Sequence, residues 1–355
     1  MVRTGTRLGD ESVYVAASRF RDVGMRARQS VFAPPRPAWS LASFQELERE
    51  FASEPDTSGG SFEAKLRSQL SRCSDDARLL MAELLTLHLL ITNTTGRPAK
   101  LKTIGNALGT MAVPVPVPAE LDRALEHGFV NPGPYFNTGR PAQLRFLVHA
   151  GAMLASLPND ELDPILDDPW RFRESLEPFG GQGSAAQRQA LLHLLFPATY
   201  EAIVSSEHRP RIVDHFAPVT SYEPTGDLDR DLIALRERLE PRYGEDFDFY
   251  SPRLRPLWEK SADPWPAVAR WAAKLYATDG FEQEERTYKL EAVESFKDVR
   301  SALQSGGDIV EPLRRLHRNA NANLVDYRAV TNFLAWVEAD PERARRVISD
   351  LLDST

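Results

Sequence analysis

The spacing of apolar residues along most of this chain is that of amphipathic helices. The clearest example lies between residues 74 and 91, where apolar side chains recur every three or four positions, at Leu79, Leu80, Leu84, Leu87, Leu90 and Ile91. Ser74 is suited to cap the start of this segment, and Asp75 and Asp76 favour its first turn, where the helix dipole stabilises negative charge. The pattern therefore predicts a core helix.

The same periodicity predicts helices over much of the remaining chain. An N-terminal helix carries Val13, Ala16, Phe20 and Val23 on one face, and Ser40 is placed to cap the helix after it. Further helices are expected over 61–70, 120–126, 143–157, 187–196, 212–216, 228–239, 264–277, 281–304, 309–317 and 324–352. Strand-like alternation is nearly absent. We expect a mainly α fold with little or no β-sheet, either a multi-helical bundle or an irregular helical array, with an α-solenoid as the alternative.

Breaks in the helical pattern suggest the domain organisation. A chain of 355 residues is long enough for two or three domains. The run 180–183 contains three glycines and is the clearest break, whereas the alternating prolines of 114–118 predict an extended crossing. We predict an N-terminal helical domain over 1–180, a central helical region over 181–262 with an aromatic, acidic loop, and a C-terminal helical region over 263–355.

Composition narrows the class of protein. The chain is 42% hydrophobic and 26% charged, which excludes a disordered chain, collagen and a disulfide scaffold. Its one cysteine, Cys73, fits a reducing compartment, and no apolar run is long enough to span a bilayer or to serve as a signal peptide. We therefore expect a cytoplasmic protein without membrane contact. The net charge of −8 gives no global attraction to phosphate, so nucleic acid would need a local basic patch.

Motifs for chemistry are weak. No phosphate-binding loop of the form Gly-x-x-x-x-Gly-Lys-Ser/Thr occurs. Asp56, Glu63 and Lys65 superficially match a metal-dependent nuclease, but Glu63 and Lys65 lie in a helical pattern, not on the adjacent strands that such a site needs. A zinc site at His208 and His215 would need a third and a fourth ligand, for which Glu207 and Asp214 are the only candidates close in sequence, and separate capping or surface histidines are the favoured alternative. The sequence predicts no catalytic residue, no metal site and no cofactor, and hence a chain that is not an enzyme.

Two basic patches are the candidates for nucleic-acid contact. The first forty residues carry seven arginines, among them Arg21 and Arg28, against three acidic residues. The second patch comprises Arg314, Arg315 and Arg318, and it is followed by Asn319, Asn321 and Asn323. Arginine and asparagine are side chains that grip phosphate and read base edges, although ordinary surface charge also produces such short clusters.

Three tryptophans are candidates for contact with a protein partner. Trp258, Trp265 and Trp271 could anchor a partner in an apolar groove, because tryptophan is enriched at the energetic centres of interfaces. The alternative is that these side chains pack in the core.

Several segments resemble a known family. The similarity is carried by the stretch from Leu191 to Phe216, by Ser30-Val-Phe-Ala-Pro34 with Trp39, by Asn131-Pro-Gly-Pro-Tyr-Phe-Asn137, and by Asp248-Phe-Tyr-Ser-Pro252 with Trp258. Together these segments resemble the region upstream of the ATPase domain in McrB-like bacterial AAA+ proteins. They are packing and turn motifs, so they indicate lineage more than chemistry.

The resemblance implies a function in defence against phage. Members of that family are motor subunits of modification-dependent restriction systems, in which an N-terminal region recognises DNA or a partner, an AAA+ ring hydrolyses nucleotide, and a separate subunit cuts. Because this chain carries no Walker motif, nucleotide hydrolysis does not carry over, and we expect either the N-terminal part of such a protein or a chain without the motor.

We therefore expect a non-catalytic recognition or scaffold module that binds DNA, an AAA+ ATPase domain or a nuclease subunit. The alternative hypothesis is a stand-alone helical adaptor between proteins, and a third is an enzyme whose site is assembled from dispersed residues.

Overall fold

The computed structural model describes most of the first 259 residues and a small part of the remainder. The described ranges are 10–53, 60–133, 135–179, 183–251, 254–259, 298, 301–302, 305, 307–308 and 310–319. The chain divides into two compact units, Met1–Glu259 and Lys260–Thr355.

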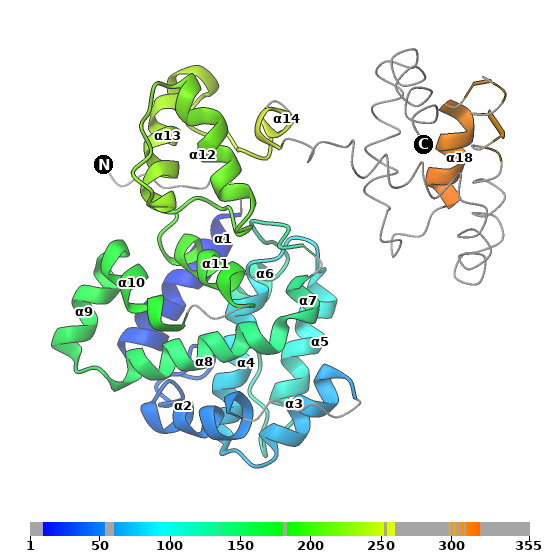
Figure 1. Ribbon diagram of the computed structural model, residues 1–355. Helices are drawn as coiled ribbons and strands as arrows, with labels where there is room; N and C mark the ends of the chain where they lie inside the picture. The colour runs from blue at the N-terminus through cyan, green and yellow to red at the C-terminus, as the bar shows by residue number, and fades with distance from the viewer. Residues whose placement is uncertain are drawn as a thin grey trace. The chain divides into compact units, whose positions relative to one another are not determined.

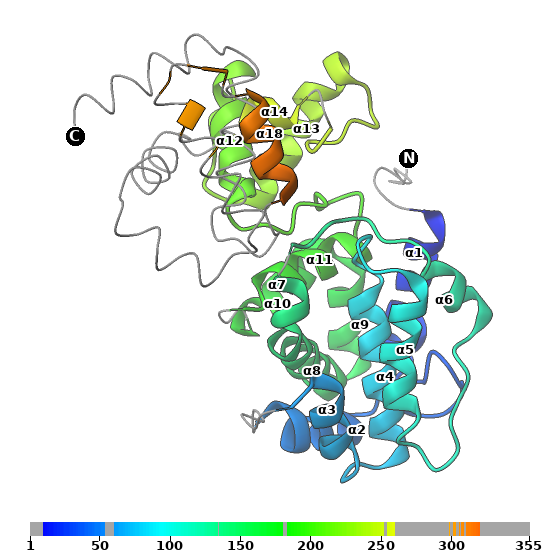
Figure 2. The ribbon, with the colours of Figure 1, turned by 90° about the vertical axis from the view of Figure 1, so that its right-hand side faces the viewer.

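The first unit is built from helices joined by connections of different lengths (Figures 1 and 2). Its N-terminal part contains α1 (Glu11–Arg19), which continues into a π-helical segment η1 (Phe20–Arg26), α2 (Leu41–Leu47) with its own π-helical continuation η2 (Glu48–Ala52), α3 (Phe62–Leu70), α4 (Asp75–Leu89), α5 (Arg97–Leu108) and α6 (Ala119–Ala124). The chain continues through α7 (Tyr135–Thr138), α8 (Arg140–Ser156), α9 (Asn159–Asp167), α10 (Pro169–Ser175), the short 3-10 helix η3 (Glu177–Phe179), α11 (Ala185–Leu195), α12 (His208–Val219), α13 (Leu228–Tyr243) and α14 (Arg255–Trp258).

These elements confirm the mainly α prediction. Within the described residues the extended pairing is confined to an isolated bridge between Thr92 and Val130. In the second unit the described helix is α18 (Val310–Asn319), which matches the predicted helix over 309–317. No helix in the described part of the chain is both long and apolar enough to cross a membrane.

Helix α4 lies at the centre of the larger core, where it packs against α2, α5 and α8 (Figure 2). Every residue from Leu79 to Leu89 is buried, because this helix is in contact with neighbours on all sides. A helix surrounded in this way needs apolar residues around its whole circumference, which explains the high density of leucine in its sequence. The predicted cap is confirmed, since the backbone N–H of Ala77 donates to Ser74 Oγ at 3.3 Å.

A buried carboxylate on α4 holds the segment that joins η1 to α2. Glu83 accepts hydrogen bonds from the backbone N–H groups of Val31 (3.0 Å) and Phe32 (2.9 Å). It also accepts from Ser30 Oγ and from Trp39 Nε1, each at 2.5 Å. The residues singled out at 30–34 and 39 in the sequence therefore wrap around a single acidic side chain.

A second, smaller hydrophobic core lies among α12, α13 and α14 and runs from Ile203 to Trp258. The ion pair between Arg236 and Glu201 is buried beside it, and the Arg236 guanidinium lies 4.2 Å from the ring centroid of Phe247. The larger core contains residues from both sides of the glycine-containing run 180–183 and extends to Val204. The domain boundaries predicted at residues 180 and 262 stay predictions.

Helices α5 and α9 are among the described helices that had no counterpart in the sequence analysis. Helix α5 begins behind Gly96 with a proline in its first turn, and α9 has Pro158 as its N-cap residue and contains Pro164. Prolines near a helix start are compatible with helix because the first N–H groups have no partner within the helix. The helices expected over 264–277 and 324–352, and most of that over 281–304, lie outside the described residues.

Candidate functional site

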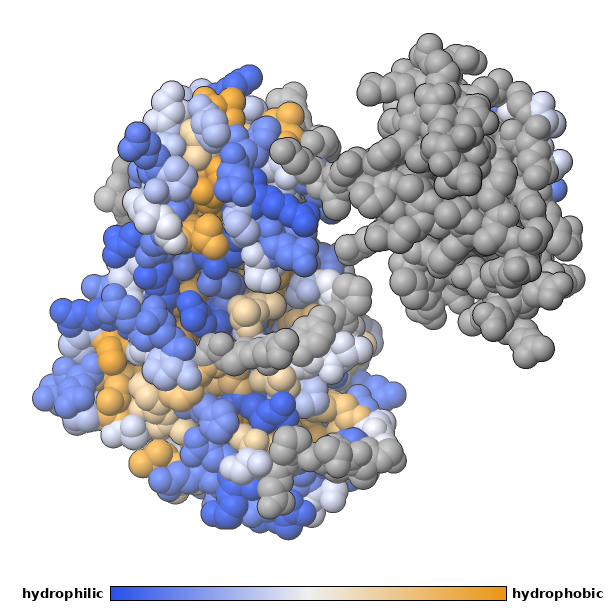
Figure 3. Space-filling view, viewed as in Figure 1, coloured by the Kyte–Doolittle hydropathy of each residue, from blue (hydrophilic) through white to orange (hydrophobic). Residues whose placement is uncertain are grey.

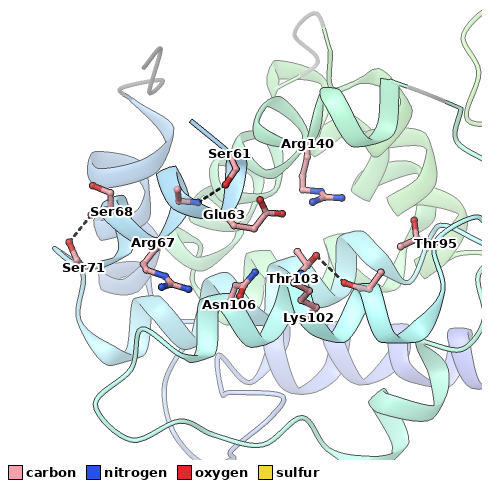
Figure 4. Close-up of a pocket in the computed structure, with 12 residues that line it drawn as sticks. Ser61, Glu63, Arg67, Ser68, Ser71, Thr95, Lys102, Thr103, Asn106 and Arg140 are labelled. Atoms are coloured by element: carbon pink, nitrogen blue, oxygen red, sulfur yellow. Dashed lines mark hydrogen bonds between the residues drawn. The ribbon is translucent and has the colours of Figure 1, made fainter. Parts of the chain in front are cut away.

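One candidate site is a pocket between α3 and α5, at the beginning of α8. Its volume is about 940 Å³, near the upper end of the range for small-molecule sites in proteins. It is lined by Ser61, Glu63, Ala64, Arg67, Ser68, Ser71, Thr95, Ala99, Lys102, Thr103, Asn106 and Arg140 (Figure 4). Nine of these twelve residues carry a hydroxyl, amide or cationic group.

The pocket forms because two helices face each other with small and polar residues in place of an apolar stripe. On each helix the lining positions follow the spacing i, i+3, i+4 and i+7, which places them on one helical face. These positions are Ala64, Arg67 and Ser68 on α3 with Ser71 at its C-cap, and Ala99, Lys102, Thr103 and Asn106 on α5. Facing stripes of this composition cannot close into a hydrophobic contact, so the space between them stays open.

Positive charge exceeds negative charge in this pocket. Arg67, Lys102 and Arg140 line it together with one acidic residue, Glu63. Arg67 and Lys102 are exposed and form no salt bridge with any residue that the structure describes. In a protein of net charge −8, the pocket is therefore a local concentration of cationic side chains.

Arg140 enters the pocket from the first turn of α8. Its guanidinium lies 5.3 Å from the ring centroid of Phe62, the first residue of α3. Burial lowers the pKa of Arg140, and the Glu63 carboxylate opposes this shift by favouring the charged form. Because an arginine side chain does not lose its proton in proteins, Arg140 contributes a fixed positive charge at the edge of the core.

The first turns of three helices also meet at the pocket. Ser61 caps α3, where its Oγ accepts from the Ala64 N–H at 3.2 Å, while α5 begins behind Gly96 and α8 behind Gly139. The N-terminal end of a helix carries partial positive charge and attracts anions. The helix N-termini and the cationic side chains therefore both attract an anion. The pocket is suited to binding an anion through charge and hydrogen bonds.

The predicted basic patches are not brought into this pocket. In the first unit, Arg21 Nε donates to Asp22 at 3.0 Å, and Arg28 Nη2 donates to the backbone carbonyl of Leu157. These local contacts satisfy part of their hydrogen-bonding capacity within the fold.

In the second unit, α18 carries the other predicted patch. Arg314 lies 3.8 Å from Glu311, and Arg315 Nη1 donates to Asp298 at 2.8 Å. Arg318 is part of the same helix, but its side chain lies outside the described residues. A role of either patch in binding nucleic acid stays a prediction.

Trp258, a predicted partner anchor, is only 1% exposed. Its indole Nε1 donates to the backbone carbonyl of Phe249 at 2.6 Å, so it packs in the second core as the structural alternative requires. A side chain buried in this way cannot itself contact a partner. Trp265 and Trp271 lie outside the described residues.

The residues considered for a nuclease site or a zinc site have other surroundings in the structure. Glu63 and Lys65 lie on helix α3, as expected, and not on the strands of a nuclease core. His208 bonds through Nδ1 to the Tyr250 hydroxyl at 2.9 Å, and the ring of His215 packs on its neighbour Phe216. Within the described part of the chain, no group of three or more metal-binding side chains is assembled.

Sequence reasoning missed Arg67, Lys102 and Arg140. These residues are isolated in the sequence, spread over 67–140, and only the packing of α3, α5 and α8 brings them together. The sequence signal for the pocket is the polar stripe on α3 and on α5. Any solvent-exposed helical face shows such a stripe, so the signal does not identify a pocket.

Comparison with known protein families, curated proteins and solved structures finds no match to this chain.

Proposed function

We propose that this chain is a non-catalytic recognition module that binds the phosphates of a nucleic-acid strand in the pocket between α3 and α5. The observation that carries the proposal is the meeting of Arg67, Lys102 and Arg140 in one pocket, where Glu63 is the one acidic residue among the described residues of the lining. Phosphate contacts supply most of the affinity in sequence-independent binding of nucleic acid.

The size and the lining of the pocket favour a strand over a free phosphate ion. A volume of about 940 Å³ is far larger than one phosphate needs, and the cations come from three different helices. Hydroxyl and amide groups between them, such as those of Ser68, Thr103 and Asn106, are of the types that contact phosphate and sugar oxygens.

The test is fluorescence anisotropy with labelled single-stranded and duplex DNA at about 50 mM salt, where phosphate contacts are least screened. We expect Lys102→Glu to weaken binding about tenfold or more, because it replaces attraction to phosphate by repulsion. Arg123→Glu is the matched control, since Arg123 is an exposed residue on α6 outside the pocket and the change in net charge is the same.

Two results would overturn the proposal. One is the absence of DNA binding at low salt. The other is a loss of binding that follows Arg315→Glu on α18 but not Lys102→Glu, which would place the nucleic-acid contact on the second unit.

A further inference from the structure

A second hollow lies on the surface of the first unit, away from the proposed DNA pocket, where α12, α13 and α14 meet. Its volume is about 470 Å³, and its lining includes Val219 from α12, Arg238 and Arg242 from α13, and Leu257 from α14. We refer to it as the α12–α13 groove. Figure 3 shows hydrophobic side chains reaching the surface over these two helices.

Two large apolar side chains on the groove are exposed. Val219 is 62% exposed and Leu257 is 43% exposed, and both lie on this groove. Leu257 directly precedes the buried Trp258, so the short helix α14 turns its tryptophan inward and its leucine outward. Trp258, the predicted partner anchor, therefore packs in the core, and the adjacent Leu257 is the residue of α14 that lines the groove.

The rim of the groove is positively charged. Arg238 and Arg242 are four residues apart on α13 and lie on the same helical face. Their guanidinium groups lie 4.6 Å and 5.3 Å from the ring centroids of Tyr222 and Tyr243. Neither arginine forms a salt bridge within the described residues, and none of the residues lining the groove is acidic.

From this combination we infer that the α12–α13 groove docks an acidic amphipathic helix of a partner protein. Apolar side chains of the partner would cover Val219 and Leu257, and its carboxylates would pair with Arg238 and Arg242. Helix-in-groove binding of this kind takes affinity from the apolar contact and selects its partner by charge. The inference rests on residues other than those of the DNA pocket, so either one can hold without the other.

A designed peptide serves as the probe. It is a labelled helix of about 15 residues with leucines at the spacing i, i+3, i+4 and i+7 and glutamates at most other positions. A second peptide keeps the leucines and replaces the glutamates by lysines. We expect the full chain to bind the acidic peptide measurably in fluorescence anisotropy and the basic peptide at least tenfold more weakly.

Variants of the groove separate charge from apolar contact. Arg242→Glu should weaken binding of the acidic peptide about tenfold and strengthen binding of the basic one, whereas Arg123→Glu, the exposed control on α6, should change neither. Leu257→Ser should weaken both peptides, because it removes the apolar contact that they share. Since both altered side chains are at the surface, circular dichroism should show an intact fold.

Several outcomes would overturn the inference. Equal binding of the two peptides, or binding that is insensitive to Arg242→Glu, would show that charge does not select the occupant. Self-association of the chain that Leu257→Ser abolishes would place a second copy in the groove instead of an acidic partner. Loss of DNA binding through Lys102→Glu would leave these results unchanged, since Lys102 lies outside the groove.

Discussion

At the scale of single residues, Glu83 shows how one buried charge can organise a long connection. Four donors from the segment between η1 and α2 converge on its carboxylate, two of them backbone N–H groups. Burial raises the pKa of Glu83, and the four hydrogen bonds oppose that shift. A carboxylate accepts hydrogen bonds at both oxygens, which a neutral amide of the same shape cannot do.

Glu83→Gln should therefore destabilise the fold by about 3 kcal/mol, because the new NH₂ group would face donors and leave them unpaired. The measurement is urea unfolding followed by circular dichroism at pH 7. Glu174→Gln is the control, since Glu174 is exposed on α10 and should change the free energy of unfolding by less than about 0.5 kcal/mol. Equal stability of the two variants would show that the cluster around Glu83 contributes little.

A second buried residue, His88, links stability to pH. Its Nδ1 lies 2.8 Å from Gln187 Oε1, and its ring stacks on Phe136 with centroids 4.2 Å apart. Burial lowers the pKa of His88 to about 3 from the usual 6.5. Because the pKa of the folded state is the lower one, the contribution to stability is complete above pH 6.5 and is lost as the pH falls toward 3.

Between pH 7 and pH 5 this one group should cost about 2 kcal/mol of unfolding free energy. His193 is also buried with a lowered pKa, so the wild type must be compared with a variant to isolate His88. In His88→Leu the loss of stability over this range should be smaller by about that amount. Urea titrations at the two pH values measure it, and parallel curves for both proteins would contradict the assignment.

At the scale of elements, the packing of α8 on α2 depends on a close approach. A Cβ atom added at Gly151 would lie 2.2 Å from Cε1 of Phe44, a side chain of α2 that is 1% exposed. The ring is enclosed by the larger core and has little room to move, so the glycine is required by contact between helices and not by backbone conformation.

Gly151→Ala should destabilise the protein by about 1–3 kcal/mol, as expected when extra volume is forced into a packed core. Gly105→Ala on α5 is the matched substitution, because nothing lies within 4 Å of the added Cβ atom there. Alanine in an open helical position should stabilise by about 0.5–1 kcal/mol. Thermal unfolding of both variants should thus show shifts of opposite sign, and shifts of the same sign would rule out the steric explanation.

The elements also show what the sequence could and could not predict. The helix over α4 was predictable because its apolar density, serine cap and acidic first turn all agree. Helix α5 was not, because Gly96 and Pro98 suggest a turn and its apolar residues are few. The pocket could not be predicted because periodicity identifies a polar face on α3 and on α5 but does not tell that the two faces meet.

At the scale of the whole molecule, overall charge and local charge have opposite signs. The chain carries 43 Lys and Arg residues against 51 Asp and Glu residues, so its average field repels nucleic acid. The three cationic side chains of the pocket oppose this average field locally. Salt limits the range of both the average field and the pocket's field to about 10 Å at 0.1 M. Binding in the pocket should therefore depend on a few short-range contacts.

This dependence predicts the response of DNA binding to salt. If Arg67, Lys102 and Arg140 each contact one phosphate of a single strand, the logarithm of the binding constant should fall against the logarithm of salt concentration with a slope of about −2. Affinity would then drop about 20-fold between 50 and 200 mM salt. Lys102→Ala should reduce the steepness of this slope by about 0.7, because one fewer counterion is released, while Arg123→Ala should leave it unchanged. A slope near zero would mean that the pocket binds its ligand through uncharged groups, and a slope much steeper than −2 would require cations outside the pocket.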